Sequence, residues 1–177
     1  MTTHDCIFQE RKATIDSPYH FVDSGLPNVY LTGIRYRVCS TCREQSADIP
    51  EVKQLMSVIA QAVVENESPL TGPEIRFLRK RLGKKSSEFA RIIGVSLEQV
   101  SRWENGRNPP EASADKLIRI YYCHLSGNRE LRERIDKHIE SWLASLPGEN
   151  QLPCIRAKIK RDVWTASPCA AWLSPCR

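Results

Sequence analysis

Residues 94–110 read Gly-Val-Ser-Leu-Glu-Gln-Val-Ser-Arg-Trp-Glu-Asn-Gly-Arg-Asn-Pro-Pro and decide which fold is expected. Gly94 marks a tight turn after an apolar helical stretch, and Ser96 and Gln99 have the spacing of a helix-capping pair. The helix that they open is expected to end at Glu104, because Asn-Gly stops a helix and the two prolines prevent it from restarting. Two short helices joined by a glycine-containing turn form a helix-turn-helix.

The second helix of this pair carries side chains that can read DNA bases. In helix-turn-helix proteins, the N-terminal residues of the second helix face base edges in the major groove. Arg102 can donate two hydrogen bonds to guanine, Gln99 can pair with adenine, and Glu98 can accept from cytosine. Val100 and Trp103 are expected to face the core. The candidate DNA-binding residues at or beside this helix are Lys84, Lys85, Ser86, Ser96, Glu98, Gln99, Arg102 and Arg107.

Positive charge is concentrated in the same part of the chain. The whole chain has a net charge of +5, whereas residues 76–107 contain nine Lys or Arg and three Glu, a net charge of 9 − 3 = +6. A charge focused in this way is typical of a surface that faces phosphate. Ser86 is also expected to cap the helix 86–93, whose amides would meet a phosphate. Each residue alone is equally well a cap or a solvated side chain, and their coincidence in one stretch favours DNA binding.

Further elements follow from periodic apolar positions and turn residues. Alternating β-branched and aromatic residues predict a strand over Val29–Val38, with a partner strand over Ile15–Val22. The last predicted helix has an apolar stripe that we expect to form the dimer surface: Leu131, Ile135, Ile139, Trp142 and Leu143. The predicted helices outside the helix-turn-helix span 49–64 with Pro50 at the start, 71–82 with a Thr71/Glu74 capping box, 112–125, and 129–144.

Cysteine spacing near the N-terminus suggests a metal site. Cys39 and Cys42 follow the predicted strand, and one turn brings two such thiolates to a single zinc ion. The nearest candidates for the other two ligands are His4 and Cys6, with His20 as an alternative. The competing interpretation is a metal-free module whose cysteines act as small buried hydrophobic residues. Seven cysteines are an odd number for a disulfide framework, and no βαβ pattern supports a redox pair.

The stretch 94–110 resembles the signature of the Cro/CI (XRE) family. The chain departs from that family before this stretch, at Ser86, where the family usually has Gln. The order of the parts resembles the MqsA/YgiT-type antitoxins over about residues 1–128. Cys6, Cys39 and Cys42 match three of that family's four zinc cysteines, and Thr3 stands at the position of the first. This resemblance implies a structural zinc, a toxin bound by the N-terminal module, and a homodimer that represses its own operon at a palindromic operator.

The predicted fold class is mainly α, in four parts. A small β-containing, zinc-knuckle-like module with a C-terminal helix spans residues 1–65, and a linker spans 66–71. An all-helical Cro/CI-type helix-turn-helix domain spans 72–145. The tail, 146–177, is expected to be disordered because it holds prolines and cysteines with few periodic apolar residues.

Three functions compete at this point. The first is a sequence-specific repressor that is the antitoxin of a toxin pair. The second is a stand-alone regulator, for example of a phage or mobile element, whose N-terminal module senses a ligand or another protein. The third is an enzyme with a helical accessory domain, which the sequence supports least because it has no nucleophile–base pair, paired carboxylates or phosphate loop. No membrane span or secretory signal is recognisable, so a cytoplasmic protein is expected.

Overall fold

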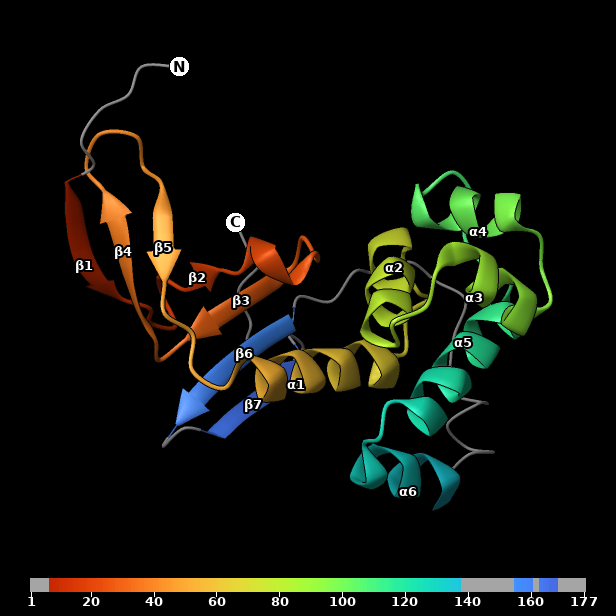
Figure 1. Cartoon of the computed structure of the whole chain (residues 1–177). Coiled ribbons are helices and arrows are strands. Elements are labelled where there is room, and N and C mark those ends of the chain that lie inside the picture. Colours follow the sequence, from red (N-terminus) through yellow and green to blue (C-terminus); the bar gives the residue numbers. More distant parts are fainter. Residues whose placement is uncertain (1–6, 138–154, 161–162, 169–177) are drawn as a thin grey trace.

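The computed structural model describes residues 7–137, 155–160 and 163–168, which form a β-rich unit and a helical unit with one helix between them (Figure 1). A 3-10 turn, Val22–Ser24, also lies in the β-rich unit. The strands are β1 Phe8–Lys12, β2 Tyr19–His20, β3 Val29–Thr32, β4 Arg35–Cys39, β5 Gln45–Ala47, β6 Ile155–Lys160 and β7 Val163–Pro168. The helices are α1 Val52–Glu65, α2 Gly72–Arg81, α3 Ser86–Ile93, α4 Leu97–Glu104, α5 Ala112–Leu125 and α6 Arg129–Lys137.

The β-rich unit contains two sheets, in the strand orders β1-β4-β5 and β2-β3-β6-β7. The single strand predicted over Val29–Val38 is wrong, because the chain leaves one sheet and enters the other at Gly33. Gly33 has a φ of +89°, a conformation that favours glycine, and a Cβ there would lie 2.7 Å from the backbone oxygen of Ile159. The partner strand expected over Ile15–Val22 is confirmed only at β2, which pairs with β3 in antiparallel fashion.

The prediction of a disordered tail is wrong for residues 155–160 and 163–168. There β6 runs parallel to β3, with Leu31 opposite Ala157, and β7 returns antiparallel to β6. The side chain of Trp164 is buried, and its Nε1–H donates to the Pro50 carbonyl at 3.0 Å. Isoleucine and alanine alternate with Arg and Lys in β6, which is a strand pattern. The partner strand, however, lies more than a hundred residues earlier in the chain.

Helix α1 packs against β6 and β7 and also contacts α2 and α5 of the helical unit (Figure 1). Its Leu55, Ile59 and Val63 are fully buried, whereas Val52 at its start is exposed. The helix begins later than predicted. Glu51 has a φ of +48° and stands at the N-cap, so that Pro50 precedes the helix instead of occupying its first turn.

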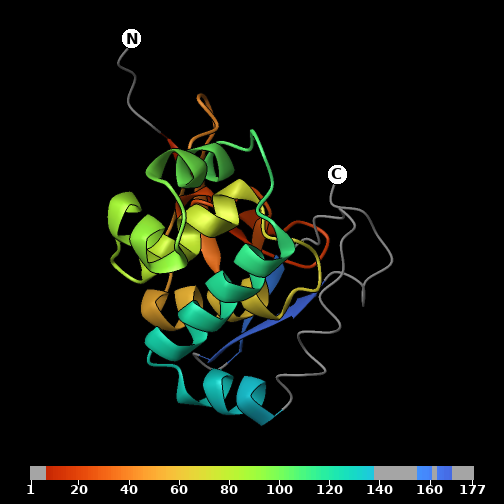
Figure 2. The ribbon, with the colours of Figure 1, turned by 90° about the vertical axis from the view of Figure 1, so that its right-hand side faces the viewer.

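Helix α5 holds the segment between α1 and α2, which was predicted to be a linker. Arg119 is fully buried and donates to the carbonyls of Val63, Val64, Asn66 and Ser68 at 3.3, 2.8, 2.5 and 2.6 Å. Carbonyls at the end of α1 have no partner within the helix, and a cation there also meets the negative end of the helix dipole. Two views place α5 beside α1 (Figures 1 and 2). Arg119 therefore links the two units.

Asp115 completes this junction. Its Oδ1 accepts from Arg119 Nε at 2.6 Å, and its Oδ2 accepts from the Leu70 backbone N–H at 2.5 Å. Both charged side chains are buried, and a buried charge is costly without a partner of opposite sign. Arg119 and Asp115 provide that partner for each other.

Helix α6 begins at Arg129 as predicted and is described as far as Lys137. The expected dimer stripe must be corrected at Leu131 and Ile135. These two side chains are buried inside the chain and are not part of its surface. The other members of the stripe lie outside the described residues. No helix among the described residues is long and apolar enough to span a membrane.

The capping box at the start of α2 is confirmed and contains a buried acid. The Thr71 backbone N–H and Oγ1–H donate to Glu74 Oε2 at 2.8 and 2.7 Å, whereas the buried Glu74 Oε1 has no hydrogen-bond partner among the described residues. Burial raises the pKa of the Glu74 carboxyl above its ordinary value of 4.5, against smaller opposing effects of the Thr71 hydrogen bonds and of Arg119. The unpartnered oxygen can accept the proton without breaking either Thr71 bond.

Glu74→Gln is expected to change how stability depends on pH. Because the folded state binds this proton more tightly than the unfolded chain does, the proton stabilises the fold fully below pH 4.5. That stabilisation is lost as pH rises through the folded-state pKa. Urea unfolding at several pH values should therefore show wild type losing stability relative to Glu74→Gln as pH rises from 4.5 through the folded-state pKa. A constant difference across that range would contradict the expectation.

Candidate nucleic-acid interface

The turn between α3 and α4 has the geometry expected of a helix-turn-helix. Gly94 has a φ of +79°, and the backbone N–H groups of Gly94 and Val95 both donate to the Ala90 carbonyl at 3.0 Å. These bonds end α3 sharply and turn the chain into α4. Ser96 caps α4 as predicted, since its Oγ accepts from the Gln99 backbone N–H at 3.1 Å.

Helix α4 has one buried and one solvent-facing side. Val100 and Trp103 are buried, as predicted, and anchor the helix in the core. Gln99 is half-buried. Of the predicted base-reading residues, the structure brings Glu98 and Arg102 together on the exposed side of α4. The exposed candidates in and around α4 are Ser96, Glu98, Arg102 and Arg107.

Glu98 and Arg102 contact each other on this face. Arg102 Nη2 lies 2.6 Å from Glu98 Oε1, and both side chains are exposed. The separate base contacts expected for the two residues therefore start from an ion pair in the DNA-free chain. An exposed pair of this kind contributes little stability, so DNA can compete for it at a small cost. The spacing of four residues along a helix could have revealed this pair in the sequence.

The predicted helix cap at Ser86 is wrong. Lys85 occupies the N-cap position, and its backbone N–H donates to Glu88 Oε2 at 3.1 Å. Ser86 is instead the first residue of α3 and is half-buried. One amide near the start of α3 is therefore already occupied by a side chain of the same helix. The Lys85 side chain is exposed and the Lys84 side chain is half-buried beside it.

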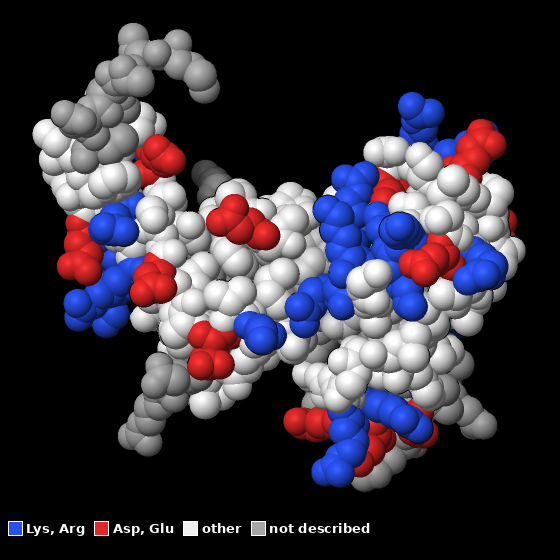
Figure 3. Space-filling model, in the orientation of Figure 1, with Lys and Arg blue, Asp and Glu red and all other residues white. Residues whose placement is uncertain are grey.

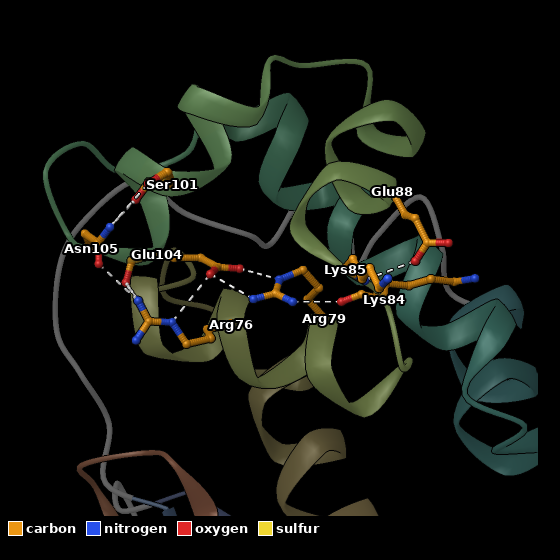
Figure 4. A network of polar contacts seen from close by, with 8 residues as sticks. All are labelled: Arg76, Arg79, Lys84, Lys85, Glu88, Ser101, Glu104 and Asn105. Atoms are coloured by element: carbon orange, nitrogen blue, oxygen red, sulfur yellow. Dashed lines mark hydrogen bonds and ion pairs between the residues drawn. The ribbon is translucent and has the colours of Figure 1, made fainter.

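A buried ionic network holds the C-terminal end of α4 against α2 (Figure 4). The Arg79 Nε and Nη2 atoms lie 2.5 and 3.0 Å from the two Glu104 carboxylate oxygens, and its Nη1 donates to the Lys84 carbonyl at 2.7 Å. Arg76 Nη2 donates to the Glu104 carbonyl and to Asn105 Oδ1 at 2.9 and 3.1 Å. Arg79 thus connects three segments: α2, in which it lies, the turn before α3, and α4.

Because of this network, not all charged residues of the stretch 76–107 lie on the surface, contrary to the expectation from the sequence. Arg79 and Glu104 are each only 8 % exposed, so they are not part of a phosphate-facing surface. On the face shown in Figure 3, Lys and Arg side chains nevertheless gather where α2 lies, whereas they are mixed with Asp and Glu on the β-rich unit. The exposed basic residues of the stretch 76–107 are Lys80, Arg81, Lys85, Arg91, Arg102 and Arg107.

The predicted metal ligands are only partly within the described residues. Cys39 is buried at the end of β4 and Cys42 is exposed in the turn that follows. The Ile7 carbonyl accepts from the Ser40 backbone N–H at 3.0 Å, so the start of β1 lies against this turn. His4 and Cys6 lie outside the described residues, among which no cluster of three or more ligand-type side chains occurs.

The alternative ligand His20 is engaged elsewhere. Its ring stacks on Tyr30 with a centroid separation of 4.8 Å, and its Nε2 lies 2.9 Å from the Pro27 carbonyl oxygen. These contacts keep the imidazole in the second sheet, whereas the Cys39–Cys42 turn lies at the end of the first.

The sequence of this region is similar to those of known proteins. Residues 75–127 match the family described as helix-turn-helix. An uncharacterised HTH-type transcriptional regulator of Escherichia coli K12, YiaG, is 32 % identical over 88 residues, which are 45 % of this chain and 92 % of that protein. The chain belongs to the helix-turn-helix (XRE-type) family of transcriptional regulators.

A second relative extends the match beyond the helix-turn-helix of this regulator. Antitoxin MqsA of Escherichia coli K12 is 30 % identical over 118 residues, which are 66 % of this chain and 88 % of that protein. No solved structure matches the chain.

Two features in or beneath the candidate interface cannot be recognised from local sequence patterns. The Arg79–Glu104 pair was missed because its members are 25 residues apart and each looks like a surface charge. Leu97, in the first turn of α4, has no polar group that would mark it in the sequence as a base-reading residue. Its side chain is 53 % exposed, although it stands between two polar candidates.

Proposed function

We propose that this regulator is a sequence-specific repressor that binds a palindromic operator as a homodimer in the cytoplasm. The observation that carries the proposal is the outward face of α4, where Glu98 and Arg102 are exposed while Val100 and Trp103 anchor the opposite side in the core. Such a helix can enter the major groove without disturbing the fold. The basic residues around it supply the attraction to phosphate that any DNA sequence offers.

Arg102→Ala is expected to lower the preference for the specific sequence while weak, salt-dependent DNA binding remains. Loss of a bidentate contact to guanine costs about 1–3 kcal/mol of discrimination, or roughly 5- to 150-fold. Fluorescence anisotropy at several salt concentrations, with the gene's own upstream DNA and with random DNA, measures both quantities. Wild type should prefer the upstream DNA by about a thousandfold.

Arg35→Ala is the matched control for this measurement. Arg35 is an exposed arginine that faces an acid, Glu10, at 3.9 Å, but it lies in β4. This variant should bind like wild type. If Arg102→Ala keeps the full preference, α4 is not the reading helix. If wild type has no preference for the upstream DNA, autoregulation is contradicted.

We further propose that the regulator is the antitoxin of a toxin–antitoxin pair, with residues 1–65 as the toxin-binding part. The similarity to a protein named antitoxin MqsA supports this role, because the matched length exceeds the helix-turn-helix. The alternative is a stand-alone regulator whose N-terminal part senses another ligand or protein. Co-expression with the adjacent reading frame distinguishes them: an antitoxin should relieve growth arrest by that product and co-purify with it.

A structural zinc ion is part of the same proposal. Cys39 and Cys42, one turn apart, would supply two thiolates, with Cys6 and His4 as the other ligands. Such an ion would tie the start of the chain to the turn after β4, against which Ile7 already lies. Metal analysis of the purified protein should find one zinc per chain, and Cys42→Ser should lose it.

A further inference from the structure

The one large apolar side chain on the outward face of α4 is Leu97. It is 53 % exposed, and its neighbours in sequence, Ser96 and Glu98, are exposed as well. Single exposed leucines are common on protein surfaces, so exposure alone indicates nothing. The position is what distinguishes Leu97, because it is the first helical residue of α4, where side chains of a reading helix face base edges.

Helical geometry divides the outward face of α4 into two columns. Residues four apart lie one above the other, so Leu97 stacks with Ser101, and Glu98 stacks with Arg102. The second column is polar and is joined by the 2.6 Å ion pair. In the first column, Ser101 is exposed and its Oγ lies 3.4 Å from Asn105 Nδ2. Leu97 is the member of this column at the N-terminal end of the helix.

We infer that Leu97 is a specificity-determining residue that contacts the 5-methyl group of a thymine in the operator. Leucine has no hydrogen-bonding group on its side chain, so it can read a base only through apolar contact. In the major groove, the thymine methyl is the apolar group that distinguishes one base from the others. This inference rests on the proposed DNA binding through α4.

The adjacent polar column predicts where the contacted thymine lies in the operator. Because Glu98 follows Leu97 directly, the thymine lies next to the base pair that Glu98 and Arg102 contact. Leu97 has no role in the core, which Val100 and Trp103 supply from the opposite side. Its truncation therefore tests recognition and leaves the fold intact.

The test uses the duplex that the wild-type protein enriches from a library of random sequences. Each thymine of that duplex is replaced in turn by deoxyuridine, which lacks only the 5-methyl group. Wild type should lose about fourfold in affinity at one position of each half-site, as expected for loss of one buried methyl contact. Leu97→Ala should bind the parent duplex about fourfold more weakly or worse and should be insensitive to deoxyuridine at that position.

Leu125→Ala is the matched control, because Leu125 is also 53 % exposed but lies at the C-terminal end of α5. It should bind every duplex like wild type. Leu97→Ala should still respond to changes of the base pair that Arg102 contacts. The inference is overturned if no deoxyuridine weakens wild type, or if the same deoxyuridine weakens Leu97→Ala equally.

A second arm places 5-methyl-deoxycytidine at each cytosine of the duplex. Strengthened binding by wild type but not by Leu97→Ala, with no effect of deoxyuridine anywhere, would assign the contact to methylated cytosine and overturn its assignment to thymine. If the library yields no enriched sequence, the proposed function fails, and the inference that rests on it fails with it.

Discussion

Arg79→Met is expected to lower the free energy of unfolding by about 3–5 kcal/mol, because it leaves the Glu104 carboxylate buried without its main partner. The two side chains are almost fully buried, so water cannot replace the lost guanidinium. The Lys84 carbonyl loses its donor as well. Urea unfolding followed by circular dichroism measures the loss, and DNA binding should fall with it because α4 loses its attachment to α2.

Lys80→Met is the control for this substitution, since Lys80 neighbours Arg79 on α2 but is exposed. It should change stability by no more than about 0.5 kcal/mol, as is usual for surface positions. A double variant, Arg79→Met with Glu104→Leu, should recover part of the lost stability because it removes both buried charges. Equal effects of Arg79→Met and Lys80→Met would show that the buried pair does not hold α4 in place.

Arg119→Met is expected to be about as damaging, again by about 3–5 kcal/mol, because it strands the buried Asp115 carboxylate. It also removes the donor to four backbone carbonyls at the end of α1 and in the segment after it. Unsatisfied buried carbonyls add to the cost. The loss should be concentrated at the junction between the two units.

Hydrogen exchange over residues 63–70 locates that loss. The Leu70 backbone N–H, which Asp115 accepts at 2.5 Å, should exchange faster in Arg119→Met than in wild type. Arg119→Lys should restore little, because a compact ammonium has three donors and cannot match the planar fork of the guanidinium. Lys116→Met, on the same helix but less buried, should leave this exchange unchanged. Unaltered protection of Leu70 in Arg119→Met would contradict a structural role for the junction.

The junction has a consequence for the proposed function. The β-rich unit is completed by β6 and β7, which follow the helical unit in the chain, so the helical unit is inserted between two parts of one sheet. Arg119 fastens the other connection. A partner bound to the β-rich unit would therefore act on a body that is attached to the helical unit at more than one point.

Local features of the sequence predicted the helix-turn-helix well. Its helices are short, the two residues of each capping pair are three positions apart, and the apolar residues repeat with the helical period. Residues that are close in the sequence therefore specify where these helices begin and end. Ser96, Gly94 and the Thr71–Glu74 pair all have the predicted positions. The cap assigned to Ser86 failed because Glu88 satisfies the preceding amide, that of Lys85, and nothing in the spacing ruled out that choice.

The sequence by itself thus determined the helical unit, the candidate DNA-reading helix α4 and the buried side of that helix, because these depend on contacts within a few residues. Tertiary structure alone decided that Ala157 pairs beside Leu31, that Arg119 caps α1, and that Arg79 binds Glu104. Each of these joins residues at least 25 positions apart. A charged or apolar residue has the same local pattern whether it meets water or a distant partner, and only the folded chain brings that partner into contact.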